Sequence, residues 1–356
     1  MVYVRGLRSD IGMGRLGGEI SRIKSLDSLR GIAALIVVLY HSVYTVNLGT
    51  FSTQNSWIYG LEKLLLFPAK FGESAVFLFM ALSGYVLAFA YEKYQFLGFK
   101  NWVNWRFLRL LPLYYASLLV SGLICYLLFK TSLITMPQFL HYYLFSNSTI
   151  YSGPNPPLWS LTVEIILSTL FLIILRFSKL IGQRYIFFVL LYFTSYLIDG
   201  WGGRALLRST IFFSIGISIY LGLQLTRPLK IVFLTMTSIF FVLGLFEVNF
   251  ARQLMTLLQL FAIPSVLYMS LRRPLDSKFT LFIGKISFSI YVWHWPVLSV
   301  LREFQPNSYL IFPLNKLIIA AISMALVIAW ATISYFLIEA PMQRFAKRFV
   351  PTKFSG

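Results

Sequence analysis

Repeated runs of about twenty apolar residues restrict the fold of this chain more than any other feature. A helix rises about 1.5 Å per residue, so a bilayer core of about 30 Å needs about 20 apolar residues to cross it. The sequence predicts ten spans, at residues 29–48, 74–91, 110–129, 158–175, 185–198, 207–225, 229–246, 254–271, 279–301 and 311–338. Hydrophobic residues make up 58% of the chain, a share outside the range of soluble domains. We therefore expect an all-α, polytopic membrane protein.

The net charge of +19 is carried by the connections between these spans. With a cytoplasmic N-terminus, 23 of the 31 Lys and Arg residues fall in cytoplasmic segments. This is the positive-inside bias, so we expect both termini in the cytoplasm. A nucleic-acid-binding surface would instead cluster its cations, so we expect no nucleic-acid partner.

We expect one folded domain, because the chain shows no internal repeat and no low-complexity linker. Residues 1–25 have no apolar signal-peptide core and predict a flexible, basic cytoplasmic tail. Residues 26–345 form the predicted transmembrane domain, and residues 346–356 a short basic cytoplasmic tail. Cys125 is the single cysteine, which excludes an internal disulfide and a cysteine metal site. We expect no metal.

Three ionisable residues, His41, Glu164 and His294, lie deep inside the predicted spans. Arg30 and His41 are eleven positions apart, which places them on one helical face, about 16 Å apart along the axis. Glu164 lies about 9 Å inward from the outer edge of its span, and His294 lies about 22 Å outward from the inner edge of its span. We expect His41, Glu164 and His294 to share one depth in the outer half of the membrane.

Ionisable groups within a membrane are costly, so they should face the bundle interior or a water-filled cavity. The segment "GKISFSIYVWHWP" adds polar residues at intervals of three and four, which line one helical face, namely Gly284, Ser287, Tyr291 and His294. We interpret this set as a single site. The alternative is that each histidine only bridges neighbouring helices by hydrogen bonds. Glu73 and Ser83 stay ambiguous, and His141 is expected in an outer loop.

Arginines at the predicted inner surface form a second group. Arg106 and Arg109 in "NWRFLRLLPLYY" are three residues apart on one face, where the third span enters the membrane. Paired guanidinium groups suit phosphate because they donate two directed hydrogen bonds. The alternative is that these arginines only set the topology. We favour phosphate binding for Arg30, Arg106 and Arg109, and the topological interpretation for Arg272 and Arg273.

Six segments, in order from residue 26 to about residue 345, carry a resemblance to a known family. They are "LDSLRGIAALIVVLYH", "VFLFMALSGYVLA", "WRFLRLLPLYY", "PPLWSLTVEI", "GKISFSIYVWHWP" and "YFLIEAP". In these segments the chain resembles the membrane acyltransferase 3 family of O-acyltransferases. The resemblance implies a ten-helix core that transfers an acyl group, usually acetyl, from cytoplasmic acyl-CoA to a hydroxyl of a carbohydrate. The hydrolase-like domain fused to some members is expected to be absent.

Together, the resemblance and the residues imply one mechanism. Acyl-CoA is a polyanion with a thin thioester arm, so Arg30, Arg106 and Arg109 are expected to bind the donor. His41 is expected to act as general base on the acceptor hydroxyl, or to carry the acyl group as an acyl-imidazole; an unperturbed pKa of about 6.5 suits either task. Glu164 is expected to orient or charge-balance His41 or His294.

The remaining expectations concern support, partners and location. Ser287 and Tyr291 support the site, and Glu339 is assigned to structure or gating near the donor mouth, through an ion pair with an arginine. The partners are a carbohydrate or glycolipid acceptor and the lipid bilayer, in a bacterial cytoplasmic membrane. The alternative function is a transporter of a lipid-linked sugar that couples protons through the buried His and Glu residues. Transporters commonly show paired repeats with broken helices, and this sequence shows none.

Overall fold

The computed structural model describes a set of helical segments. Its described residues are 24–44, 56–94, 99–129, 154–177, 201–220, 235–239, 252–272, 275, 277–303, 315–346 and 348. Within these ranges the structure is helical and contains no strand. The predicted spans 185–198 and 229–246, apart from residues 235–239, lie outside the described residues, as do His141 and most of both predicted tails. The all-α prediction is confirmed for the part of the chain that is described.

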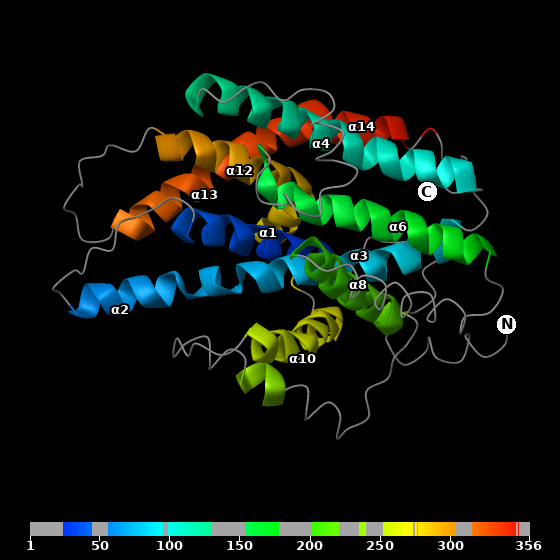
Figure 1. Cartoon of the computed structure of the whole chain (residues 1–356), viewed down its shortest axis with the longest axis horizontal. Coiled ribbons are helices and arrows are strands. Elements are labelled where there is room, and N and C mark those ends of the chain that lie inside the picture. The colour runs from blue at the N-terminus through cyan, green and yellow to red at the C-terminus, as the bar shows by residue number, and fades with distance from the viewer. Residues whose placement is uncertain are drawn as a thin grey trace.

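The first part of the chain forms α1 (Lys24–Tyr44), α2 (Ser56–Leu65), the short 3₁₀ helix η2 (Phe67–Phe71) and α3 (Gly72–Tyr94). Asp27 in the first turn of α1 complements the positive end of the helix dipole. A proline occupies the first turn of η2, where its missing N–H costs no helical hydrogen bond. As a result α2, η2 and α3 continue nearly in line (Figure 1).

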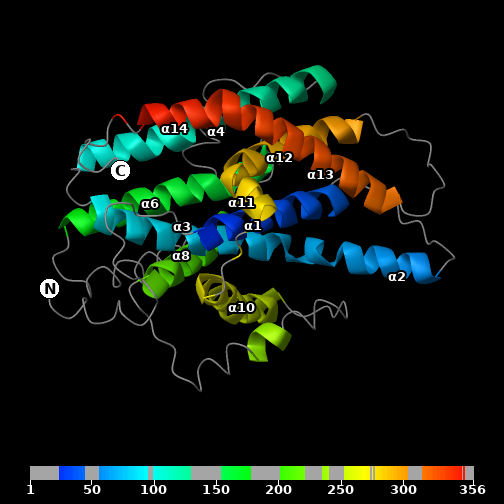
Figure 2. The ribbon, with the colours of Figure 1, turned by 180° about the vertical axis from the view of Figure 1, so that it is seen from behind.

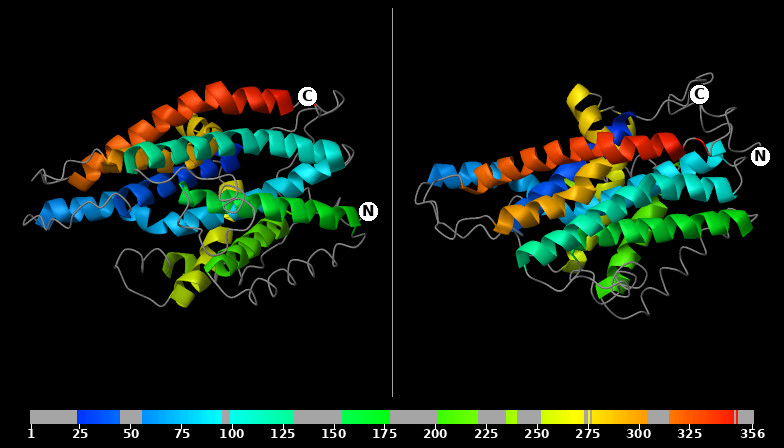
Figure 3. Two further views of the ribbon diagram at one scale, coloured as in Figure 1. Left: turned by 45° about the horizontal axis from the view of Figure 1, so that its top comes forward. Right: turned by 90° about the horizontal axis from the view of Figure 1, so that it is seen from above.

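The middle of the chain forms α4 (Phe99–Phe129), the 3₁₀ helix η3 (Pro156–Leu158), α6 (Trp159–Phe177) and α8 (Trp201–Tyr220). The C-terminal part forms α10 (Arg252–Arg272), α11 (Lys278–Lys285), α12 (Ser287–Glu303), α13 (Asn315–Ser334), the π-helix η4 (Tyr335–Glu339) and α14 (Ala340–Ala346). Ser277 caps α11, because its hydroxyl accepts a hydrogen bond from the Thr280 N–H at 3.1 Å. Figure 3 shows α13, η4 and α14 as one continuous, curved rod.

Four helices are long and apolar enough to cross a membrane: Lys24–Tyr44, Gly60–Ala90, Asn104–Leu128 and Leu317–Ala346. Pro156–Phe171 and Leu258–Leu271 are shorter apolar helices. These six correspond to the predicted spans that begin at residues 29, 74, 110, 311, 158 and 254. The membrane character of the chain is thus supported, whereas the count of ten spans, the cytoplasmic termini and the domain boundaries stay predictions.

Two predicted spans differ from the observed helices. The third was predicted to begin at residue 110, but α4 begins at Phe99, so Arg106 and Arg109 lie inside a helix. The ninth was predicted as one helix over 279–301, which is wrong, because the chain breaks at Ile286, whose φ is −97° and ψ 7°. Ser287 helps to explain the break: its hydroxyl donates to the Gly284 carbonyl at 2.8 Å and competes with the backbone ladder.

The helices are arranged around α1 and α3. Helix α1 contacts α3, α11, α12 and α13, while α4 and α14 pack on each other beside α12. On the other side of α3 lie α8 and α10 (Figure 1). Seen from behind, α11 crosses α1 near the middle of the bundle (Figure 2). The centre of the bundle is therefore built from the helices that carry Arg30, His41, Ser83 and Tyr291.

Among the described helices, α3 and α8 cross very closely. A Cβ on Gly216 would lie 1.9 Å from the Ala81 carbonyl oxygen, and one on Gly84 would lie 2.0 Å from the Phe213 carbonyl oxygen. Only glycine fits at such a distance, and close contact between small residues is a common way for membrane helices to associate.

Replacing Gly216 should therefore separate α8 from α3. We expect Gly216→Leu to lower the free energy of unfolding by about 1–3 kcal/mol, the typical cost of overpacking a protein core. Thermal unfolding in detergent, followed by tryptophan fluorescence, measures this. Gly60→Leu is the matched control, because nothing lies within 4 Å of a Cβ at Gly60. Equal melting temperatures for the two variants would contradict the close crossing.

Candidate active site

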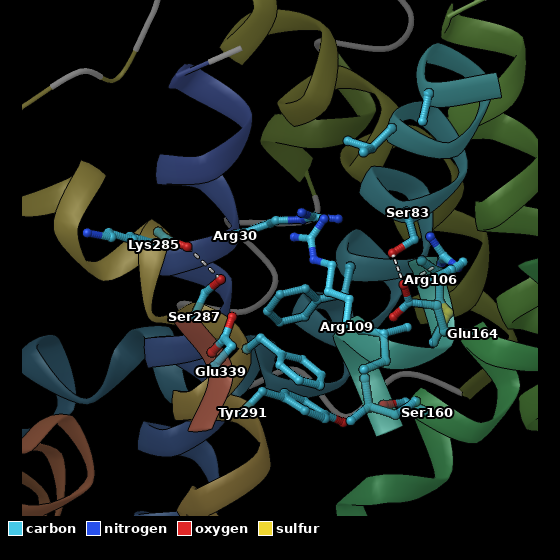
Figure 4. A pocket seen from close by; sticks show the side chains of 18 of the residues that line it. Arg30, Ser83, Arg106, Arg109, Ser160, Glu164, Lys285, Ser287, Tyr291 and Glu339 are labelled. Atoms are coloured by element: carbon cyan, nitrogen blue, oxygen red, sulfur yellow. Dashed lines mark hydrogen bonds and ion pairs between the residues drawn. The ribbon is translucent and has the colours of Figure 1, made fainter. Parts of the chain in front are cut away.

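A cavity of about 90 Å³ lies between α1, α3, α4, α6, α11, α12 and η4. Its lining includes six charged residues, namely Arg30, Arg106, Arg109, Lys285, Glu164 and Glu339. Aromatic rings and small hydroxyl residues complete the wall (Figure 4). The cavity therefore gathers all three arginines predicted to bind phosphate, although they come from two different helices.

Two of these arginines share the space over the cavity. Figure 4 shows the guanidinium groups of Arg30 and Arg109 directed toward one another, from α1 and α4. The Arg109 guanidinium carbon also lies 5.9 Å from the ring centre of Trp105. Two like charges aimed at one space favour an anion between them, because each guanidinium can donate two directed hydrogen bonds to it.

Arg106 has a different environment, because it forms an ion pair with Glu164 at 3.1 Å. The same carboxylate oxygen accepts a hydrogen bond from Ser83 at 2.8 Å, and Arg106 also donates to Ser168 at 2.6 Å. The side chains of Arg106 and Glu164 are only 17% and 15% exposed. Glu164 therefore neutralises Arg106, and Ser83, which the sequence left ambiguous, contributes to holding the carboxylate.

The partner of Glu164 differs from the one the sequence predicted. Among the described residues its carboxylate contacts Arg106 and Ser83, and neither histidine. Glu164 faces the cavity, whereas the two histidines do not line it. The expected single set of His41, Glu164 and His294 is thus divided into two neighbouring groups. The catalytic roles stay predictions.

His41 and His294 form a pair between α1 and α12. Their ring centres lie 5.1 Å apart, with an interplanar angle of 30°. The ring of His41 is also 5.4 Å from that of Trp295, edge to face. His294 is fully buried, and His41 is partly buried. The structure thus brings together the two histidines that the sequence placed at one depth.

The hydrogen bond of His294 decides which ring nitrogen can act as a base. Its Nδ1 bonds to the Tyr291 carbonyl oxygen. A carbonyl can only accept, so Nδ1 carries the proton and Nε2 keeps a lone pair. Among the described residues, this buried Nε2 has no hydrogen-bond partner. His294 therefore holds a preformed acceptor for a proton in the interior of the bundle.

Tyr291 joins the two groups. It lines the cavity, and its ring centre lies 5.5 Å from that of His294. Its hydroxyl donates to the Pro157 carbonyl at 2.8 Å and also contacts the Ser160 hydroxyl. Gly284 and Ser287 line the same cavity, so three of the four residues predicted to share one face do face one space. Only His294 points elsewhere, toward His41.

The start of α6 is attached to α12 next to this site. Pro296 has no N–H, so the carbonyl of Val292, four residues earlier, receives no helical hydrogen bond. Asn155 supplies the missing donor, because its Nδ2 donates to this carbonyl at 3.2 Å. Together with the Tyr291 bond to Pro157, this contact positions α6, and hence Glu164, against α12.

Glu339 lies at the end of the π-helix η4 and is 3% exposed. It accepts hydrogen bonds from Ser289 at 2.6 Å and Gln343 at 2.8 Å, and it lines the cavity with Arg30. Short π-helical segments occur frequently at functional sites. Its predicted place near a donor mouth and the predicted ion pair with an arginine both stay predictions.

Several residues of the site had no assignment from the sequence. Lys285 could have been noticed in the sequence, because it is a charged residue inside a predicted span. Its ammonium group lies 5.2 Å from the ring centre of Tyr335. Glu73 forms an ion pair with Arg208 at 2.7 Å, away from the cavity. Phe79 lines the cavity but carried no signal, because one more phenylalanine in an apolar run is not distinctive.

Comparison with known proteins agrees with these features. The family model described as "Acyltransferase domain" matches residues 23–336. "Putative O-acetyltransferase SACOL0978" of Staphylococcus aureus strain COL is 25% identical over 375 residues, covering 90% of this chain and 57% of that protein. "Putative O-acetyltransferase SAS0844" of strain MSSA476 is 25% identical over 372 residues, with the same coverage. The chain thus spans little more than half the length of these relatives.

No solved structure matches the chain. The match to the family model covers most of the sequence and includes the histidine pair and every residue that lines the cavity except Glu339. The chain therefore belongs to the acyltransferase 3 family.

Proposed function

We propose that this chain is an integral-membrane O-acyltransferase, which moves an acyl group from cytoplasmic acyl-CoA to a hydroxyl of a cell-envelope or exported carbohydrate. One observation carries the proposal. An arginine-lined cavity adjoins a buried histidine pair, and Tyr291 belongs to both. Such a site can bind a polyanionic donor and accept a proton nearby. Family membership and the names of the relatives support the same reaction.

Arg30 and Arg109 bind the phosphates of the donor in this proposal. Their guanidinium groups meet over the cavity from two helices, so a phosphate between them receives hydrogen bonds from both sides (Figure 4). Arg106 is assigned a different role, because Glu164 already neutralises its charge. The Arg106–Glu164 pair positions α4 against α6 and thereby holds Arg109 at the cavity.

The histidine pair performs the proton transfer. The acceptor hydroxyl gives its proton to Nε2 of His294 while its oxygen forms a bond to the thioester carbonyl carbon. The carbon–sulfur bond then breaks, and the coenzyme A thiolate takes the proton from the imidazolium. His41, whose ring lies beside that of His294, orients the acceptor hydroxyl. Direct transfer needs no acyl-histidine, so it replaces the relay as the preferred route.

The proposal is tested with purified protein in lipid nanodiscs and radiolabelled acetyl-CoA. With extracted envelope glycans as acceptor, we expect release of free coenzyme A together with label in the glycan fraction. A His294→Gln protein prepared in the same way is the control. A transporter of a lipid-linked sugar would release no coenzyme A, so label confined to intact acetyl-CoA would overturn the proposal.

A further inference from the structure

Two aromatic side chains, Phe79 on α3 and Tyr291 on α12, lie side by side in the lining of the cavity. Their ring centres lie 5.5 Å apart in an edge-to-face arrangement, with an interplanar angle of 64°. On its other side the Tyr291 ring lies 5.5 Å from His294. The two rings form one aromatic layer of the cavity lining, and Tyr291 connects this layer to His294.

The two rings are held differently. Tyr291 is 4% exposed, and its hydroxyl is fixed by the Pro157 carbonyl and by Ser160. Phe79 is partly buried; its side chain has no hydrogen-bonding group and packs against two clusters of buried hydrophobic residues. Tyr291 is thus a fixed wall, and the volume available beside it is decided by the size of the side chain at position 79.

We propose that Phe79 sets the length of the acyl group, so that the site accepts acetyl and excludes acyl groups of four carbons or more. This inference rests on the proposed function, because it concerns the donor of that reaction. The thioester carbonyl carbon must come within about 3–3.5 Å of the attacking oxygen, and that oxygen must lie within hydrogen-bond reach of His294. At that position an acyl tail meets the aromatic layer, and every added methylene competes with the Phe79 ring.

The size of the cavity supports this limit. Its volume of about 90 Å³ corresponds to space for only a few water molecules between the side chains that line it. Closely packed side chains do not readily move aside for an extra methylene. An added or missing methylene in an apolar pocket changes kcat/KM about 10- to 200-fold in known enzymes. Two added methylenes are therefore enough for strict exclusion.

The test compares donors of increasing length in the purified protein: acetyl-, propionyl-, butyryl- and hexanoyl-CoA. We expect the wild-type kcat/KM for butyryl-CoA to be at least about a hundredfold below that for acetyl-CoA. Phe79→Ala should raise the butyryl-to-acetyl ratio at least about tenfold. Phe79→Leu retains most of the apolar volume and should give an intermediate ratio; it also serves if the alanine variant does not fold.

Phe77→Ala is the matched control. It removes a phenylalanine two residues away on the same helix, but Phe77 stacks on Phe212 and does not line the cavity. Its butyryl-to-acetyl ratio should equal that of the wild type. Wild-type protein that uses butyryl-CoA as well as acetyl-CoA would overturn the inference, and so would unchanged ratios in both active Phe79 variants. A wild type that uses none of the donors would instead overturn the proposed function.

Discussion

We expect His294→Gln to lower the rate of acyl transfer at least about a hundredfold and to leave the KM for acyl-CoA nearly unchanged. Glutamine keeps a hydrogen-bonding side chain of similar reach but cannot take up a proton near neutral pH. General acid–base catalysis contributes about 10²- to 10⁴-fold, so its loss is easily measured. Donor binding is retained because His294 does not line the cavity that holds Arg30 and Arg109. The measurement is steady-state release of coenzyme A over a range of acetyl-CoA concentrations.

His41→Gln distinguishes the two routes of transfer. If His41 only orients the acceptor, an amide replaces part of its hydrogen bonding and we expect a loss of about tenfold or less. If His41 carries the acyl group, the loss must match that of His294→Gln, because an amide forms no acyl intermediate. Trp295→Phe is a suitable control, since it keeps an aromatic ring beside His41. Near-normal acyl transfer by the His294→Gln variant would exclude His294 as the base.

The helix faces could be predicted from the sequence because they depend only on local geometry. Spacing within a helix placed Arg30 and His41 on one face, and it placed Gly284, Ser287 and Tyr291 together. The structure puts Arg30 at the cavity and His41 beside His294, and the three residues on one cavity wall. The long apolar helices followed equally directly from hydropathy.

The pairing between helices could not be predicted in this way. Depth estimates placed Glu164 level with the histidines, yet depth says nothing about the angle at which a side chain leaves its helix. The rotation of α6 turns Glu164 toward Arg106 on α4 instead. The break at Ile286 lies beside the Ser287 hydroxyl bond to Gly284 and where α11 packs on α1. Contacts between helices leave no periodic pattern in the sequence, so they could not be predicted from it.

Arg106 and Arg109 are three residues apart on one helix, but we expect opposite results when each is replaced by alanine. Arg109→Ala removes a charge-assisted contact to phosphate, which is worth about 1.5–3 kcal/mol. The KM for acyl-CoA should therefore rise about 10- to 150-fold, while turnover at saturating donor and the melting temperature change little. Isothermal titration with acetyl-CoA and thermal unfolding measure the two effects separately.

Arg106→Ala should instead act on folding, because it leaves the Glu164 carboxylate enclosed without its cation. Breaking a fully buried pair costs about 3–5 kcal/mol; with side chains 17% and 15% exposed, we expect a loss of about 2–3 kcal/mol here. Adding Glu164→Gln to Arg106→Ala removes the uncompensated charge, so the double variant should regain much of the lost stability, which a double-mutant cycle quantifies. If Arg106→Ala folds normally and raises the KM as Arg109→Ala does, Arg106 binds phosphate directly, and its pairing with Glu164 is secondary.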